Sequence, residues 1–506
     1  DRVAGRARWA IDLNQDGKLG RDTSYTVRSE RVSDDDYWRD LPNRVRSQTQ
    51  RLLPGDFSLT RELNPGWGNA QAYANVATWQ VLAGRDVPSR FAAPYQRTPQ
   101  LGVRWTSDGD DAVLGGFQPW GRKARLEGGL ELEYNRFDLP AAALPEQLNT
   151  LKGGQRAQML GHVSLPFGGA GWWTIPRLSL NSAVYDLDQA QLDGRTRMAR
   201  SIPSFSVDQG WVFERKATLF GRDSLQTLEP RLLYVNTPYR SQLNLPNFDS
   251  APKDFNFDSI YTDNQFTGID RVSDADQLTA GVTTRWLDTL QGGELLRLGV
   301  AQRFLFRNQQ VTPDGVALTK RSSDLLLLGS AHLTSQWWTD ASLQYDPQTR
   351  HSERSVVSAR YAPGPFRTVS LAYRATRGQS EQVELNWQWP LFGAAARQPA
   401  GASKGPAGSC SGTWYSAGRL QYSLFDKRFV DSVVGVEYDA GCWIMRVGVE
   451  RLSTGLAQTN TRLLLQLELV GLSRLGSNAL KVLRDNIPGY RPLSADRSAS
   501  SDASYD

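Results

Sequence analysis

The sequence predicts an all-β protein, a large antiparallel transmembrane β-barrel of about 20–26 strands that can be incomplete at its N-terminus. Apolar and polar residues alternate along most of the chain, as in Val383–Trp389, where Glu384, Asn386 and Gln388 separate the apolar side chains. Many such segments have ten or more residues, enough for a tilted strand of about 9–11 residues to cross a bilayer. A run of about 18 apolar residues is absent, and the mean hydropathy is −0.47, which excludes a bundle of membrane helices.

The alternating pattern predicts roughly 21 strands before any turn is considered. Their cores are 5–13, 22–32, 56–63, 70–82, 98–106, 124–137, 156–166, 172–185, 203–216, 226–236, 277–287, 294–306, 323–334, 338–346, 354–362, 367–375, 381–390, 413–424, 431–439, 442–452 and 461–471. A barrel with both ends on one side of a membrane needs an even number, so we expect one further strand. Helical periodicity is confined to 477–485.

The connections between these strands are of two kinds. Some are tight, as at Asp439–Gly441, and others are long and polar, as at 186–202 and 238–276. Short turns on one side and long loops on the other are typical of outer-membrane barrels. We therefore assign 1–490 to one barrel domain, with a flexible insertion at 393–412, and 491–506 to a disordered C-terminal tail.

Charge and motifs argue against nucleic-acid binding and against a cofactor. The chain has 49 Arg and 9 Lys, and its 58 basic residues are interleaved with 53 acidic ones instead of clustered. His162, His332 and His351 lack the spacing of metal ligands, and nucleophile-elbow and phosphate-loop motifs are absent. Asp12–Lys18 begins like a calcium loop, but a hairpin turn with Asp-Gly chemistry explains it better.

Charged residues that alternate with apolar ones are expected to line the barrel lumen. Residues i and i+2 of a strand share a face, and an Arg on the lipid face costs roughly 2–4 kcal/mol near the bilayer centre. The predicted lumen wall comprises Glu131, Glu133, Glu229, Arg231, Arg285, Arg374, Glu384, Arg419, Arg446 and Glu468. By contrast, the seven aspartates of the connection 249–276 suggest a solvated cap.

Several motifs resemble the LptD family of lipopolysaccharide-assembly proteins in Gram-negative outer membranes. They follow the family's order along most of the chain, and the resemblance is therefore specific. They are Arg31–Asp40, Gln226–Val235 with Thr237–Arg240, Asn256–Phe257, Asp263–Val272 with Asp274–Leu278, Ser322–Asp324, Gly435–Tyr438 with Cys442–Trp443 and Arg446–Val447, and Leu465–Leu469 with Gly471–Leu472 and Asn486–Tyr490.

The resemblance implies insertion of lipopolysaccharide into the outer leaflet through a barrel lumen and a lateral gate, at the cell outer membrane and without catalysis. In the family, a periplasmic jelly roll receives the lipid, and a 26-strand barrel opens between its first and last strands. The implied partners are lipopolysaccharide, an LptE-like lipoprotein plug, the periplasmic transport bridge and the barrel-assembly machinery. The position of Arg31–Asp40 implies that the jelly roll and the first barrel strands precede Asp1.

The two cysteines leave a choice open. Gly441 stands where the family usually has the first of two adjacent Cys, and the family's Cys in this turn pair with Cys of the jelly roll. Cys410 and Cys442 are expected at the same end of the barrel, one hairpin apart, so a bond between them is the alternative.

Two other functions are compatible with part of the pattern. One is a porin or an uptake channel, although the motifs favour the LptD resemblance. The other is a secreted carbohydrate-active β-protein, in which Glu131 and Glu133, on one strand face, would be the paired carboxylates.

Overall fold

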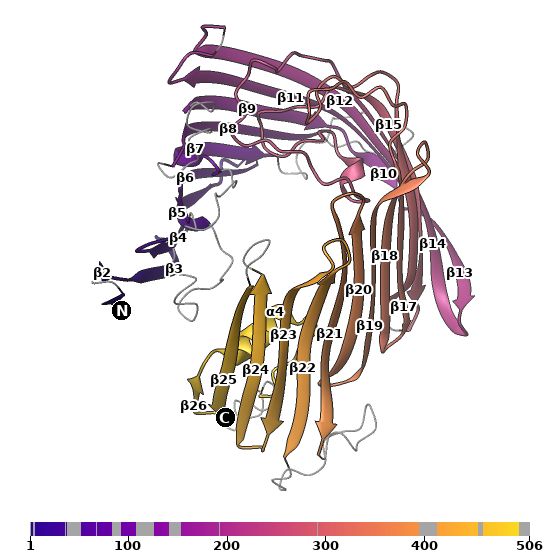
Figure 1. Ribbon diagram of the computed structural model, residues 1–506. Coiled ribbons are helices and arrows are strands. Elements are labelled where there is room, and N and C mark those ends of the chain that lie inside the picture. Colours follow the sequence, from indigo (N-terminus) through magenta and orange to yellow (C-terminus); the bar gives the residue numbers. More distant parts are fainter. Residues whose placement is uncertain are drawn as a thin grey trace. The chain divides into compact units, whose positions relative to one another are not determined.

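The computed structural model describes residues 2–3, 6–35, 37, 52–66, 68–82, 93–107, 126–140, 153–191, 193–290, 292–393, 412–453 and 459–494. Strands make up 67% of these residues and helices 3%. Twenty-four strands belong to one antiparallel sheet, within the predicted range (Figure 1). The described helices include none that is long and apolar enough to cross a membrane.

The strands follow one another along the chain with few interruptions. The first half comprises β1 (Arg2–Val3), β2 (Arg6–Ala7), β3 (Ala10–Lys18), β4 (Thr23–Val32), β5 (Leu52–Leu63), β6 (Asn69–Val81), β7 (Gln96–Thr106), β8 (Glu127–Asp138), β9 (Gly154–Ser164), β10 (Phe167–Gly169), β11 (Trp172–Leu187), β12 (Arg197–Trp211) and β13 (Phe213–Leu219).

The second half comprises β14 (Arg222–Thr237), β15 (Ala275–Asp288), β16 (Glu294–Leu305), β17 (Leu325–Thr334), β18 (Trp337–Asp346), β19 (His351–Gly364), β20 (Arg367–Thr376), β21 (Ser380–Phe392), β22 (Thr413–Ser423), β23 (Arg428–Asp439), β24 (Trp443–Ser453), β25 (Thr459–Leu469) and β26 (Ser473–Gly476). A short 3-10 helix, η3 (Ser259–Tyr261), and α4 (Ala479–Asn486) complete the elements.

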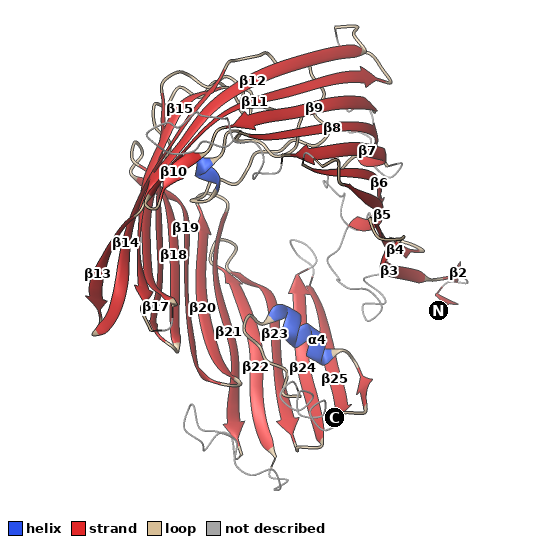
Figure 2. Cartoon of the chain, turned by 180° about the vertical axis from the view of Figure 1, so that it is seen from behind, coloured by secondary structure: helices blue, strands red, loops and turns tan. Residues whose placement is uncertain are grey.

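The chain divides into two compact units. Unit 1 contains Asp1–Phe213, Glu229–Val282 and Ala301–Ser323, and unit 2 contains Glu214–Leu228, Thr283–Val300 and Asp324–Asp506. In unit 1 the connection between β14 and β15 folds over one face of β11 and β12 (Figure 1). In unit 2, α4 lies on one face of β22, β24 and β25 (Figure 2).

Each unit has its apolar core where one of these segments meets the sheet. In unit 1, Phe248 packs with Phe137 and Tyr185. In unit 2, Leu480 and Leu483 pack against Val433. The opposite face of the sheet keeps many of its large apolar side chains exposed, so among the described residues no second layer of protein covers them.

Three predictions about local structure are wrong in detail. Asp12–Lys18 is extended in β3 and pairs with β4, and the turn follows at 19–22, so this run forms neither the hairpin turn nor a calcium loop. Asp270 and Asp274 are buried, whereas Asp254 and Asp258 are exposed, so the connection 249–276 is not a solvated cap throughout. Leu493 is also buried, and 491–494 are therefore ordered; the rest of the predicted tail lies outside the described residues.

Candidate functional site

In several strands the sheet buries carboxylates on one face and exposes leucines on the other, the reverse of a water-soluble sheet. In β25, Leu463 is 71% exposed and Leu465 55%, whereas Gln466 and Glu468 are 3% and 4% exposed. β8 repeats this pattern, with Leu130 and Leu132 exposed and Glu133 and Asn135 buried. The alternation of apolar and polar residues in the predicted strand 461–471 is confirmed in terms of exposure. We call the side that carries Glu133 and Glu468 the polar face, and its opposite the apolar face.

Ion pairs between neighbouring strands organise the polar face. In unit 2, Arg446 of β24 contacts Glu437 of β23 at 2.8 Å and Glu468 of β25 at 2.5 Å. Glu384 of β21 contacts Arg374 at 2.9 Å and Arg419 at 3.2 Å. Each carboxylate thereby neutralises guanidinium groups from adjacent strands, so that buried charges have partners.

The remaining predicted wall residues also lie in strands and have strand partners. Glu131 accepts a bond from Arg104 Nε at 3.0 Å, and Arg231 bonds Asp208 at 2.6 Å in unit 1. Arg285 lies 3.8 Å from Glu294 in unit 2, and Glu229 is half-buried. The structure therefore places all ten predicted residues in strands. Their orientation towards a lumen stays a prediction.

Glu131 and Glu133 form a structural cluster. The Tyr73 hydroxyl donates to both carboxylates, at 3.1 and 2.5 Å. Glu133 also accepts from Gln100 and Gln158, at 2.7 and 3.1 Å. These bonds occupy the oxygens that a general acid or base would use on a substrate, so this geometry does not favour the carbohydrate-active alternative.

Unit 1 also carries a segment that covers its polar face, which we call the loop segment (238–274). Its central contact is Arg156 of β9, which is 0% exposed and donates to Asp249 and to Asp270, both at 2.7 Å. Asp270 is also fully buried and accepts from the Tyr185 hydroxyl at 2.9 Å and from the Phe248 amide at 2.6 Å. The guanidinium of Arg156, in the sheet, thus binds the carboxylates of Asp249 and Asp270, in the loop segment.

The charge state of this contact follows from its surroundings. Burial raises the pKa of Asp249, but the hydrogen bond and positive charge of Arg156 outweigh that effect and lower the pKa to about 2. The Arg156 guanidinium also lies 4.9 Å from the Phe137 ring, which stacks on Phe248 at 4.3 Å. Asp249 therefore stays ionised at neutral pH, and the cation lies in an apolar setting that strengthens its attraction to the carboxylates.

Further contacts tie the loop segment to the sheet and to the next connection. Arg200 of β12 donates to the carbonyl of Ile269, and the Arg231 guanidinium lies 4.5 Å from the Tyr261 ring. The backbone amides of Gln310 and Val311 donate to Asp274, at 2.9 and 2.8 Å, which joins the connection after β16 to the same structure.

Unit 2 has its own covering segment, the tail segment (477–494). α4 presents Leu480 and Leu483 to Ala417 and Val433, and Ile487 joins this cluster. Beyond α4, the Tyr490 hydroxyl donates to Glu437 at 2.7 Å, and Leu493 packs against the sheet. Burial raises the pKa of Tyr490, and the negative charge of Glu437 adds to this increase, so the phenol remains protonated and donates.

Sequence reasoning missed most of the partners that complete these networks. The Arg446–Glu437 pair depends on the length of the turn between β23 and β24: the four residues 440–443 place the two residues directly opposite, whereas the turn predicted at Asp439–Gly441 does not. Arg156 and Asp270 are 114 residues apart, and no local pattern connects them.

Cys442 is exposed, and Cys410 lies outside the described residues, so the predicted disulfide stays a prediction. In the described ranges, no group of three or more His, Cys, Asp or Glu could hold a metal ion.

Comparisons with known proteins point to one family. The model of the family LptD, described as LPS transport system D, matches residues 6–394. LPS-assembly protein LptD of Albidiferax ferrireducens is 44% identical over 92% of this chain and 55% of its own length. The proteins of the same name from Polaromonas sp. and Burkholderia pseudomallei are 41% and 35% identical, over 97% of this chain and 58% and 59% of their own lengths.

This chain thus spans little more than half of the curated relatives that it matches. Among solved structures, a ferric enterobactin receptor from Pseudomonas aeruginosa is 10% identical, with a TM-score of 0.37 over 89% of this chain and 73% of that one, a likeness too weak to support an argument. The family model covers most of the residues from β2 to β21, and on that match the chain belongs to the LptD family, LPS transport system D.

Proposed function

We propose that this chain is the membrane-embedded part of a lipopolysaccharide-assembly protein in the Gram-negative outer membrane. It guides lipopolysaccharide through a lumen and a lateral gate to the outer leaflet. Family membership supports this proposal, as do the names of the relatives, which are LPS-assembly proteins. The exposed apolar face supports a location in lipid, since rows of leucine such as Leu463 and Leu465 are unfavourable in water.

One observation carries the proposal: the sheet has a polar face built from paired charges and an apolar face of exposed leucines. Lipopolysaccharide combines an anionic, sugar-rich head with several acyl chains. A wall rich in Arg and carboxylates can accompany the head, because guanidinium groups bind phosphate oxygens in pairs and exchange one anionic partner for another. The acyl chains require contact with lipid, and the lateral gate supplies it.

The chain acts without a cofactor and without catalysis. Its charged residues bind and guide, and the paired Glu131 and Glu133 hold the strand network together. The proposed partners are an LptE-like lipoprotein that plugs the lumen, a periplasmic lipopolysaccharide-transport bridge reached through a further N-terminal domain, and the barrel-assembly machinery. The disulfide of Cys442, either with Cys410 or with a cysteine outside this chain, belongs to the same proposal.

The test is photo-crosslinking in cells from two neighbouring positions. A photoreactive amino acid replaces Glu131 on the polar face in one variant and Leu132 on the apolar face in the other, within the full-length protein. We expect crosslinks to lipopolysaccharide from position 131 and mainly to phospholipid from position 132. A folded protein that crosslinks lipopolysaccharide from neither position, or equally from both, contradicts the proposal. A chain that stays monodisperse in detergent-free buffer contradicts its location in a membrane.

A further inference from the structure

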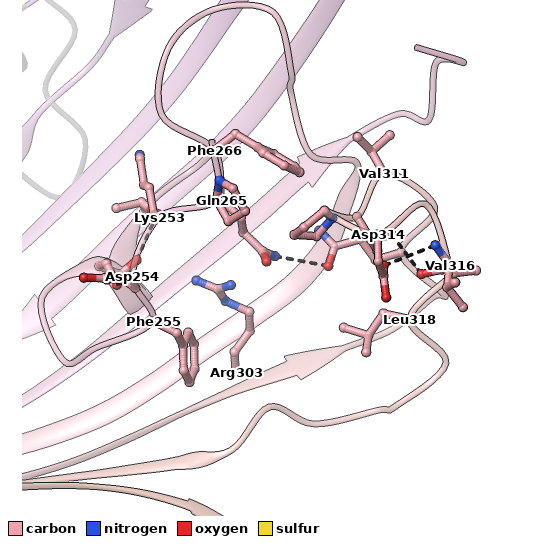
Figure 3. Close-up of a pocket in the computed structure, with 17 residues that line it drawn as sticks. Lys253, Asp254, Phe255, Gln265, Phe266, Arg303, Val311, Asp314, Val316 and Leu318 are labelled. Carbon is pink, nitrogen blue, oxygen red and sulfur yellow. Dashed lines mark hydrogen bonds between the residues drawn. The ribbon is translucent and has the colours of Figure 1, made fainter. Parts of the chain in front are cut away.

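A pocket of about 500 Å³ lies in unit 1, between the loop segment and the connection that follows β16. One wall comes from the loop segment and includes Phe255 and Phe266, and the other comes from 309–318 and includes Val311 and Leu318. Arg303 of β16 rises from the sheet into the space between the walls (Figure 3). The loop segment therefore encloses a cavity as well as covering the sheet.

Arg303 differs from Arg156 and Arg446, and resembles Arg200, because its hydrogen-bond partners among the described residues are neutral. It is only 4% exposed, and its guanidinium donates to the carbonyl of Ile260 at 2.5 Å and to the Thr279 hydroxyl at 3.4 Å, both of them neutral. Within the described part of the chain, no carboxylate forms an ion pair with it. Arg156 and Arg446, in contrast, each contact at least two carboxylates. An unneutralised buried cation is costly, and an anion in the pocket would offset that cost.

The remaining lining fits an apolar body attached to that anion. Phe255, Phe266, Val311 and Leu318 present carbon surface, and the Phe255 ring lies 5.8 Å from the Arg303 guanidinium. A second cation, Lys253, also lines the pocket. Burial lowers the pKa of Lys253, and the negative charge of Asp263 opposes that effect, so an added anion would favour the charged ammonium group.

Two carboxylates line the pocket as well, and they restrict where an anion can lie. Asp314 accepts a bond from the Val316 amide at 3.2 Å, on the side formed by the connection after β16. Asp254 belongs to the wall of the loop segment. An anionic head is therefore favoured at Arg303, at the base of the pocket, where the hydrogen-bond partners of the guanidinium, the Ile260 carbonyl and the Thr279 hydroxyl, are neutral.

We propose that this pocket binds an amphiphilic anion, with a phosphate or carboxylate head against Arg303 and a short apolar chain along Phe255, Phe266 and Leu318. The site goes beyond the proposed conduit, because it does not require lipopolysaccharide to cross the lumen. The shared chemistry is an anionic head on an alkyl chain, and it has two possible sources: the phosphorylated, acylated end of lipopolysaccharide, or a free acyl anion.

The experiment measures binding of hexyl phosphate to the folded full chain in a neutral maltoside detergent, by saturation-transfer NMR or calorimetry. Hexanol lacks the charge and inorganic phosphate lacks the chain, so both are expected to bind at least tenfold more weakly. Equal binding of hexyl phosphate and hexanol overturns the proposal. An absence of hexyl phosphate binding to protein that shows native heat-modifiable gel mobility overturns it as well.

Two variants locate the site, and a third controls for loss of charge. Arg303→Gln removes the cation and should weaken hexyl phosphate binding at least tenfold. Val316→Trp fills the rim of the pocket and leaves Arg303 in place, so it tests the site even if Arg303→Gln does not fold. It should weaken the binding of hexyl phosphate and of hexanol alike. Arg104→Gln removes an arginine that is paired with Glu131 and should leave binding unchanged. Normal binding to folded Arg303→Gln and Val316→Trp places the ligand elsewhere and contradicts the proposal.

Competition then identifies the source. Displacement of hexyl phosphate by purified lipopolysaccharide assigns the pocket to the lipid cargo, and displacement by octanoate alone assigns it to a free acyl anion. If neither displaces it, neither of the two sources is the ligand of this pocket, and the proposed assignment is contradicted. Because crosslinking from position 131 reports on the conduit, the two proposals can fail separately.

Discussion

The loop segment of unit 1 and the tail segment of unit 2 cover the polar face of the sheet by opposite means. In the loop segment, the contact itself is ionic: Asp249 and Asp270 belong to the segment, and Arg156 belongs to the sheet. In the tail segment, the ion pairs of Arg446 remain between strands, and the segment contributes the apolar side chains of α4 and one phenol, Tyr490.

Because of this difference, different changes of conditions or sequence should release the loop segment and the tail segment from the sheet. Charges that join segment to sheet respond to protons and to competing ions, whereas apolar packing responds mainly to changes of volume. For an anionic cargo, only the loop segment offers carboxylates that the cargo's own phosphates could replace on Arg156. The following predictions test the comparison, from the largest expected effect to the smallest.

Arg156→Gln should release the loop segment. Removal of the guanidinium leaves Asp249 and Asp270 buried without a cation, and loss of one partner from a buried ion pair costs about 3–5 kcal/mol. Hydrogen–deuterium exchange in detergent should therefore rise across 245–272 and stay unchanged across 479–494. Arg104→Gln, which breaks a more exposed pair, should cost about 1 kcal/mol or less. Unchanged exchange of 245–272 in Arg156→Gln would show that the ionic contact does not hold the loop.

Leu483→Ala should release the tail segment and leave the loop segment in place. Leu483 is buried against Ala417 and Val433, and a leucine truncated in such a cluster costs about 2–5 kcal/mol. Exchange should rise across 479–494 only. Arg484→Ala, at an exposed position of the same helix, is the control and should change stability by roughly 0.5 kcal/mol or less. If Leu483→Ala and Arg484→Ala show equal hydrogen–deuterium exchange across 479–494, apolar packing does not hold the tail segment on the sheet.

Acid should act on the loop segment through Asp249. Its pKa is about 2 in the folded protein, below the ordinary value of 3.8, so its ionised form stabilises the folded state by about 2 kcal/mol at neutral pH. This contribution is complete above pH 4 and is lost as the pH falls through about 2. Protease sensitivity of the loop segment, followed with an acid-active protease, should rise in that window, and Asp249→Asn should abolish the pH dependence. A transition centred near pH 4 or above would mean that Arg156 does not lower this pKa.

Tyr490→Phe should weaken the tail segment by about 1–2 kcal/mol, because Glu437 loses one of its hydrogen bonds while Arg446 remains. Exchange across 487–494 should rise slightly. Tyr373→Phe also removes a bond to a glutamate, Glu381, but at a half-buried position, and should have a smaller effect. If the two variants behave alike, burial does not strengthen the Tyr490 bond.

Local pattern was sufficient for most of the longer strands and for the helix, but it joined β12 and β13 into one segment, 203–216, and missed the short strands β10 and β26. The alternation at 463–469 predicts which leucines are exposed, and the helical period at 477–485 coincides with α4, because both depend on neighbours within a few residues. Asp12–Lys18 was mispredicted for the same reason: Asp-Gly suggests a turn locally, whereas pairing with β4 keeps the run extended.

Long-range partners could not be predicted from local pattern. The aspartates of the loop segment look like a solvated surface in sequence, and only Arg156, more than ninety residues earlier in the chain, explains why Asp249 and Asp270 are buried. Arg303 likewise resembles any strand arginine until its neutral surroundings are known. In both cases the missing information is the identity of a spatial neighbour, which a single sequence does not contain.

The separation between Arg156 and its partners also sets an order of events during folding. Asp249 and Asp270 follow Arg156 by 93 and 114 residues, and β11 and β12 intervene. While those strands add to the sheet, the guanidinium can interact with Glu133 of β8, which lies 3.9 Å away, and with water, and its full burial must wait for the loop segment. Closure of this contact therefore marks the docking of the loop segment on the sheet, and a probe that detects a hydrated Arg156 would distinguish chains in which that segment has not docked from finished ones.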